Sequence, residues 1–101
     1  KMDFIVSEKQ GQFGLLLVVT DKELIGKYFE EGNLQLDLTK KFYQGKEKSR
    51  EEVIELVEKT KNFHFTGEKS VDFGIEQDLI DKNKILIISG IPHAEVVIAS
   101  D

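Results

Sequence analysis

The chain has 101 residues, the length of one domain, and its 40% apolar and 33% charged residues are those of a globular protein. It contains no cysteine, which excludes a disulfide framework, a thiolate metal site and a cysteine nucleophile. A small domain without disulfides is expected in the cytoplasm. No apolar run reaches the length of a membrane span, so we expect no membrane association.

The first half of the chain is predicted to form strands. Residues 4–6 begin one strand, and a turn near Gly11 leads into residues 13–19, a nearly continuous apolar run. Such a run fits a strand that is buried on both faces and therefore central in its sheet. Asp21 ends this strand and is expected to cap a short helical turn at residues 24–25. The alternation of residues 34–38 predicts a strand with one wet face, and this strand is the candidate edge for a homodimer.

The second half is predicted to contain two helices and three strands. Ser49 and Glu52 form a capping box at the start of a helix over residues 50–61. Ser70 is expected to cap the second helix. Residues 63–66, 85–88 and 95–99 read as strands, and the last two form an antiparallel pair joined by residues 90–93. One apolar stripe marks the buried side of the first helix: Val53, Leu56, Val57 and Thr60.

These elements favour an α+β fold over residues 1–101, a single domain with a mostly antiparallel sheet and two helices packed on it. Strands and helices are mixed rather than regularly alternating, which argues against a doubly wound parallel sheet. No repeat, linker or low-complexity segment divides the chain. The lysine-rich, Ile- and Glu-rich composition is typical of thermophile proteins, although an AT-rich genome produces the same bias.

The sequence contains no complete motif for catalysis, metal binding or a cofactor. Residues 67–70 resemble the end of a phosphate loop, but Glu68 separates the glycine from Lys69 and the upstream glycine is missing. The two histidines, His64 and His93, lack the spacing of a metal motif. His64 lies between two phenylalanines of a predicted strand, so it should point to the opposite face. We therefore predict no metal and no cofactor, and the sequence favours a non-enzymatic protein over an enzyme without deciding between them.

An alternative hypothesis places a small active or ligand-binding pocket near Asp21, Tyr43 and His93. His93 follows a proline in a predicted strand connection, where it could act as a general base with Asp21 or Glu95. The simpler interpretation is structural: Asp21 is a cap, and a lone loop histidine is far more often solvated than catalytic.

The most informative feature is the basic segment, residues 40–50. It carries a net charge of +4 in a chain whose total is −5. Lysine and arginine side chains suit phosphate contacts and Tyr43 could stack on a base, although Phe42 could equally fill the core with the lysines solvated around it. The candidate contact residues are Lys40, Lys41, Phe42, Tyr43, Lys46, Lys48 and Arg50.

Several short patterns in order resemble a known family. They are residues 21–27 (DKELIGK), residues 42–45 (FYQG), Asn62 with Gly67, and residues 90–95 (GIPHAE). Together they resemble the small archaeal proteins called domain of unknown function 424, over nearly the whole chain. The resemblance implies an archaeal cytoplasmic protein connected with translation, and it assigns no catalytic residue.

Two functions from different classes follow. The first is a non-enzymatic interaction module that contacts RNA, the ribosome or a translation protein through the basic segment. The second is a small enzyme or ligand-binding domain that uses the pocket near Asp21, Tyr43 and His93. The missing cysteine nucleophile, metal motif and phosphate loop favour the first.

Overall fold

The computed structural model describes residues 2–99, which form a six-stranded sheet, a two-stranded sheet and two α-helices. The small sheet is a hairpin of β3 (Tyr28–Glu31) and β4 (Leu34–Asp37). The large sheet has the order β5-β1-β2-β6-β8-β7. Its strands are β1 (Phe4–Gly11), β2 (Gly14–Asp21), β5 (Lys46–Lys48), β6 (Asn62–Thr66), β7 (Leu86–Ile88) and β8 (Ile91–Val97).

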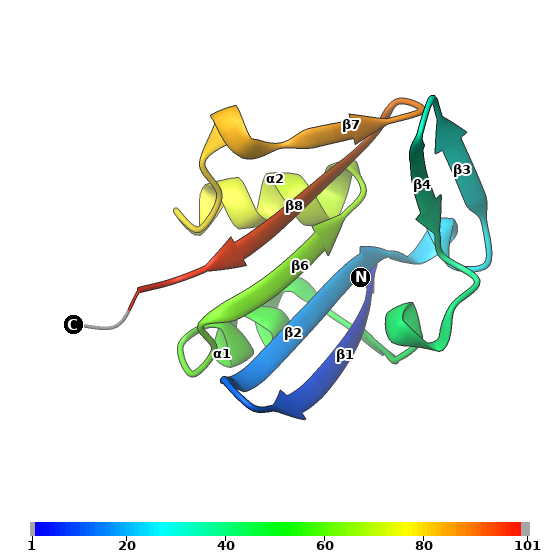
Figure 1. The fold of residues 1–101 in the computed structure, drawn as a ribbon. Coiled ribbons are helices and arrows are strands. Elements are labelled where there is room, and N and C mark those ends of the chain that lie inside the picture. Colours follow the sequence, from blue (N-terminus) through cyan, green and yellow to red (C-terminus); the bar gives the residue numbers. More distant parts are fainter. Residues whose placement is uncertain (1, 100–101) are drawn as a thin grey trace.

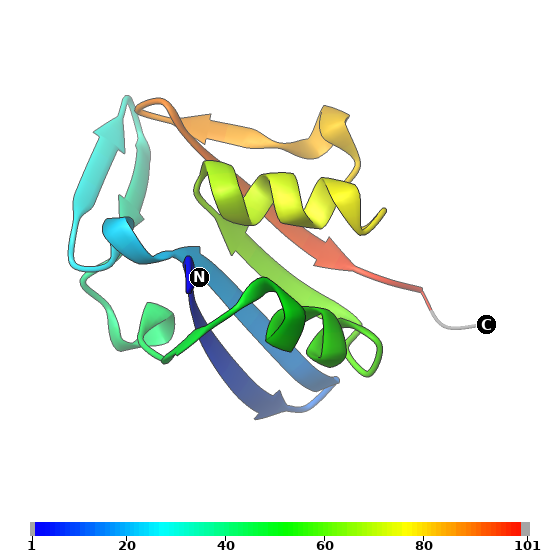
Figure 2. The same ribbon diagram turned by 180° about the vertical axis from the view of Figure 1, so that it is seen from behind.

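Both α-helices lie on the same face of the large sheet. Figure 1 views the sheet from the side opposite α1 (Arg50–Val57) and α2 (Glu68–Glu76), and Figure 2 shows the two helices across the other face. The β3–β4 hairpin stands beside one end of the sheet and contacts β7. Three short 3₁₀ helices complete the description: η1 (Lys22–Leu24), η2 (Lys41–Tyr43) and η3 (Lys82–Lys84).

The predicted α+β fold with a mostly antiparallel sheet is confirmed. Among the described strands of the large sheet, β2 and β6 form the only parallel pair. The predicted central strand is confirmed as well, because β2 pairs with β1 on one side and β6 on the other. None of the helices between residues 2 and 99 is long and apolar enough to cross a bilayer.

The main core lies between the sheet and the two α-helices. Leu17 and Val19 of β2 and Phe63 and Phe65 of β6 are fully buried there. Val53 from α1, and Val71 and Phe73 from α2, close this core. A second, smaller core joins the β3–β4 hairpin to the end of the sheet, and its buried members are Leu24, Leu36, Leu38 and Ile88.

The first helix begins where predicted and ends early. Ser49 and Glu52 form the predicted capping box: the Glu52 N–H donates to Ser49 Oγ, and the Ser49 N–H donates to Glu52 Oε1 at 2.9 Å. The helix ends at Val57 rather than residue 61: the N–H groups of Lys59 and Thr60 donate to carbonyls only three residues back, and Thr60 Oγ1 donates to the Leu56 carbonyl. Of the predicted stripe, Val53 and Thr60 are buried, whereas Leu56 and Val57 are only half-buried.

Two other predictions about local structure are wrong. Ser70 lies inside α2, whose N-cap is Gly67, so Ser70 does not cap the helix. The last strand begins at Ile91 instead of residue 95, which moves His93 from a loop into the sheet. Short strands β3 and β5 also form, although neither segment has apolar alternation: β3 pairs with β4, and β5 pairs with β1. The edges of the large sheet are β5 and β7, and self-association through β4 stays a prediction.

Candidate functional site

The face of the large sheet opposite α1 and α2, which we call the front face, carries two rows of cross-strand neighbours. In one row, Thr20 of β2 pairs with Thr66 of β6, which pairs with His93 of β8. In the next row, His64 of β6 pairs with Glu95 of β8. Because side chains alternate along a strand and paired residues point the same way, all five project to the front face while Phe63 and Phe65 enter the main core.

His93 is held in place by two polar neighbours. Its side chain is 9% exposed, its Nδ1 atom lies 2.8 Å from Thr66 Oγ1, and its Nε2 atom lies 3.3 Å from Glu95 Oε2. A threonine hydroxyl can donate or accept a hydrogen bond. It therefore fits either neutral tautomer of the ring and orients Nε2 toward Glu95 in both.

His64 approaches the same carboxylate from the other side. Its Nε2 atom lies 3.7 Å from Glu95 Oε1, and its ring packs at 66° against Phe42 with centroids 5.1 Å apart. Burial lowers the pKa of His64 below its usual value; the Glu95 charge opposes this shift and His93 adds to it. His64 therefore favours the neutral imidazole, whose ring nitrogen keeps a lone pair.

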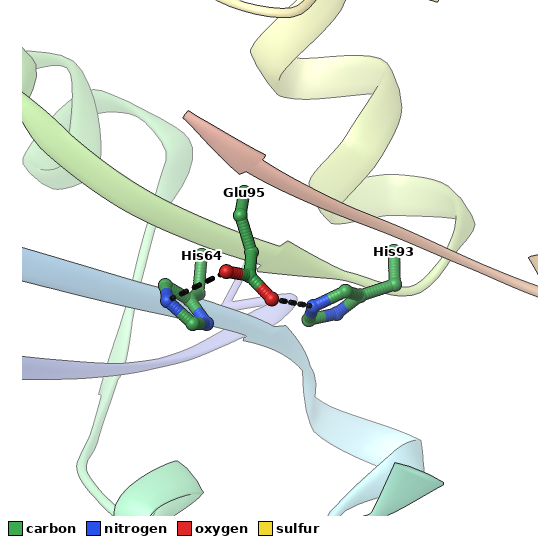
Figure 3. A group of neighbouring side chains, drawn as sticks. All are labelled: His64, His93 and Glu95. Atoms are coloured by element: carbon green, nitrogen blue, oxygen red, sulfur yellow. Dashed lines mark hydrogen bonds and ion pairs between the residues drawn. The ribbon is translucent and has the colours of Figure 1, made fainter. Parts of the chain in front are cut away.

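His64, Glu95 and His93 form one cluster, with the carboxylate between the two rings (Figure 3). One ligand atom from each residue can be chosen so that all lie within 4.8 Å of one another. This set matches the two-histidine, one-carboxylate ligand sets of metal enzymes. The sequence shows no metal motif because the two histidines lie on different strands, 29 positions apart in the chain. The local signal that could have indicated the site is His93 and Glu95, two residues apart in an apolar strand.

Two polar atoms on the front face have no hydrogen-bond partner within the described part of the chain. They are His64 Nδ1 and Thr20 Oγ1, and both are buried. Leaving such atoms unpaired costs about 1–3 kcal/mol each. Structures retain this cost mainly where a ligand or an ordered water completes the site.

A pocket of about 270 Å³ opens beside the cluster, with His64 and Glu95 in its wall. Leu16, Asn62 and Val97 contribute further wall, and Phe13 stands at the pocket with 83% of its surface exposed. A mainly apolar pocket with a few convergent polar groups is the usual form of a small-molecule site.

Tyr43 and Phe42 reach the same face from η2, which packs on β1 and β2. Both side chains are half-buried and meet edge to face with centroids 5.0 Å apart. Tyr43 also packs against the second core. Burial raises the pKa of Tyr43, and the charges of Glu95 and Asp37 raise it further. The aromatic pair is therefore part of the packing beside the cluster.

Asp21 does not lie with Tyr43 and His93. The predicted grouping of these three residues is therefore wrong for Asp21. Asp21 lies one position after Thr20 and therefore points to the helix side. Its carboxylate accepts hydrogen bonds from Ser70 N at 2.8 Å, Ser70 Oγ at 2.7 Å and Lys69 N at 3.1 Å. It caps α2, and it makes no side-chain cap to the predicted turn at η1. Burial raises the pKa of Asp21 despite these three bonds.

The basic segment includes β5, an edge strand of the large sheet. Lys46 and Lys48 pair with Val6 and Phe4, two core residues, and so point to the helix side. On that side Arg50 forms an ion pair of 2.6 Å with Glu76 and lies over the Phe73 ring. Lys40, Lys41 and Lys46 are exposed, and Lys48 is half-buried. Lys46, Lys48 and Arg50 therefore lie on the helix side, away from the front face.

Comparisons with known proteins identify relatives but no activity. The crystal structure of an uncharacterized conserved protein from Methanopyrus kandleri is similar, with a TM-score of 0.77 and 16% identity, over 97% of this chain and 95% of that one. At this identity the likeness shows the fold alone. No curated protein matches. The model of a family described as "Protein of unknown function (DUF424)" matches residues 8–98. The chain therefore belongs to the family called domain of unknown function 424.

Proposed function

We propose that this protein is a ligand-binding domain whose site lies on the front face, around His64, His93 and Glu95. The observation that carries the proposal is the convergence of these three side chains beside a pocket of about 270 Å³. The site keeps His93 from the pocket inferred from the sequence and adds His64 and Glu95, while Tyr43 packs beside it and Asp21 lies on the helix side.

The energetics of the front face support this proposal. A sheet face needs no buried polar side chain for packing. Val18, two residues before Thr20 on β2, is fully buried on this face and has no polar side-chain atom. Thr20, Thr66 and His93 are nevertheless buried there. Thr66 and His93 are partners of each other at 2.8 Å, whereas Thr20 Oγ1 and His64 Nδ1 have no partner in the described residues, and burying an unpaired polar group opposes folding. Functional sites are where proteins carry such costs.

Nuclear magnetic resonance tests the site directly. A library of small carboxylate, imidazole and amide fragments is added to the ¹⁵N-labelled full chain. We expect amide shifts centred on Leu16, His64 and Glu95, and loss of these hits in Glu95→Gln. Glu55→Gln, an exposed glutamate on α1, is the matched control and should keep them. Hits scattered over the helix side, or unaffected by Glu95→Gln, would contradict the proposal.

A second candidate function is favoured by the exposure of Lys40, Lys41 and Lys46 in a segment of net charge +4. In this alternative the protein is a non-enzymatic cytoplasmic module that contacts RNA, the ribosome or a translation protein. The half-buried Tyr43 weakens the idea of base stacking, so charge would carry the contact. Such binding should fall steeply as salt rises, because phosphate contacts release counterions.

Co-sedimentation with ribosomes tests the second candidate. The triple variant Lys40→Ala, Lys41→Ala and Lys46→Ala should lose binding and flatten its salt dependence. The control triple, Lys59→Ala, Lys82→Ala and Lys84→Ala, removes the same charge from three other exposed lysines. Equal co-sedimentation of both folded triples would end this alternative.

A further inference from the structure

We propose that the front-face ligand is a divalent transition-metal ion of the zinc class, bound by His64 Nε2, His93 Nε2 and the Glu95 carboxylate. This inference rests on the proposed function, since it names what the same site binds. Neutral imidazoles with one carboxylate suit zinc, copper, nickel and cobalt. Magnesium and calcium prefer sites made entirely of oxygen ligands.

The spacing of the three side chains fits such an ion. Metal–ligand distances of about 2.0–2.1 Å in a tetrahedral site separate two ligand atoms by roughly 3.4 Å. The His93 Nε2 to Glu95 Oε2 distance is 3.3 Å and the His64 Nε2 to Glu95 Oε1 distance is 3.7 Å. These two distances involve different oxygens of the carboxylate, and one ligand atom from each residue lies within 4.8 Å of the others, so a bound ion would draw the three side chains closer together.

The ligands are also positioned before the ion arrives. Each comes from a strand whose register is fixed on both sides, since β6 lies between β2 and β8, and β8 between β6 and β7. Thr66 Oγ1 lies 2.8 Å from His93 Nδ1. With the proton on Nδ1, the ring donates to Thr66 and turns the Nε2 lone pair toward the site. Metal-binding histidines usually have such an outer partner. Phe42 fixes the second ring by packing against it.

The site is open on one side. Glu95 has 64% of its side chain exposed and gives the ion a path in, while His93 lies at the closed end with 9% exposed. The pocket walls include both His64 and Glu95. Three protein ligands leave at least one coordination position for water or an exchangeable ligand. This arrangement is typical of catalytic rather than structural zinc sites.

Cobalt titration tests the inference on the untagged full chain. Addition of Co²⁺ should produce visible absorption bands that saturate at one ion per chain, and Zn²⁺ should displace them. His64→Gln, His93→Gln and Glu95→Gln should each weaken Co²⁺ binding by at least about tenfold. Glu55→Gln should leave it unchanged, and Mg²⁺ should not compete.

The positioning role of Thr66 has its own matched pair. Thr66→Val should weaken Co²⁺ binding by about tenfold, as loss of an outer partner does at other metal sites. Thr60→Val alters a buried threonine outside the front face, whose hydroxyl donates a hydrogen bond to the Leu56 carbonyl. Its Co²⁺ affinity should stay within about twofold of the wild type.

A measurement without variants keeps the test independent of folding defects. The chain has two histidines, so Zn²⁺ should shift the ring nitrogens of both and no others. Shifts confined to surface carboxylates, or no saturable Co²⁺ binding by the folded protein, would overturn the inference. If fragments still bind the front face in that case, the ligand-binding proposal survives. If neither fragments nor metals bind there, both proposals fail.

Discussion

Two buried threonines on the front face should respond in opposite directions to the same substitution. Thr20 and Thr66 are both fully buried and face each other across β2 and β6. Thr20 Oγ1 has no hydrogen-bond partner in the described residues, whereas Thr66 Oγ1 lies 2.8 Å from His93 Nδ1. Valine keeps the side-chain shape and suits a strand, so each substitution removes one hydroxyl and little else.

The expected magnitudes follow from those partners. Thr20→Val removes an unpaired buried hydroxyl and should raise the free energy of unfolding by about 1 kcal/mol. Thr66→Val leaves His93 Nδ1 buried without a partner and should lower it by about 1–3 kcal/mol. The two variants should thus differ by about 2–4 kcal/mol, and with urea slopes of about 1–3 kcal/mol per molar their midpoints should differ by roughly 1–4 M.

Urea denaturation of the metal-free protein, followed by circular dichroism, measures both changes. Buffers are treated with a chelator so that bound ions add nothing to stability. A loss of more than about 0.5 kcal/mol in Thr20→Val would refute the reasoning, because the hydroxyl would then have a partner. Equal losses in the two variants would mean that Thr66 does not hold His93.

Four further predictions concern the helix side, and the same denaturation assay measures each change in stability. Asp21→Ala should lower the free energy of unfolding by about 2–4 kcal/mol, because it removes the α2 cap and leaves buried donors without an acceptor. The folded variant should bind Co²⁺ normally, since Asp21 faces away from the cluster. Gly67→Ala should cost more than about 1 kcal/mol, because Gly67 has φ 105° and an added Cβ would overlap the Asp21 carboxylate. Val53→Ala should cost about 2 kcal/mol. The half-buried Leu56→Ala should cost about 1–2 kcal/mol, below the range for a fully buried leucine; a larger loss for Leu56 than about 3 kcal/mol would contradict the assigned helix face.

Elements encoded by neighbouring residues could be predicted from the sequence. The capping box of Ser49 and Glu52 is complete within four residues, and the structure forms it. The nearly continuous apolar run of β2 predicted a central strand, because a strand that is buried on both faces shows no polar alternation. The orientation of His64, opposite to Phe63 and Phe65, followed from strand geometry alone.

Features set by contacts distant in sequence could not be predicted. The α2 cap comes from Asp21, 49 residues before Ser70, and no local pattern joins them. Ser70, in the first turn of α2, was the stronger local signal, and it predicted the wrong capping residue. The sequence predicts a strand connection over residues 90–93, yet Pro92 and His93 lie within β8, where the Pro92 carbonyl accepts a hydrogen bond from Gly67 N. The cluster itself depends on the register between β6 and β8.

The FYQG motif at residues 42–45 connects the two surfaces that the sequence singled out. Gly45 brings the chain so close to β1 that an added Cβ would overlap the Val6 carbonyl oxygen. That approach fixes where η2 ends, and η2 places the Phe42 ring on His64 and beneath the Lys9 ammonium. The aromatic residues of the basic segment therefore serve the front face through packing, whereas its lysines stand apart from the cluster. Phe42→Leu should loosen the His64 ring and weaken Co²⁺ binding, while the triple lysine variant should leave Co²⁺ binding unchanged. Unchanged Co²⁺ binding in Phe42→Leu would mean that this packing does not position His64, and weakened binding in the triple lysine variant would mean that the lysines act on the cluster.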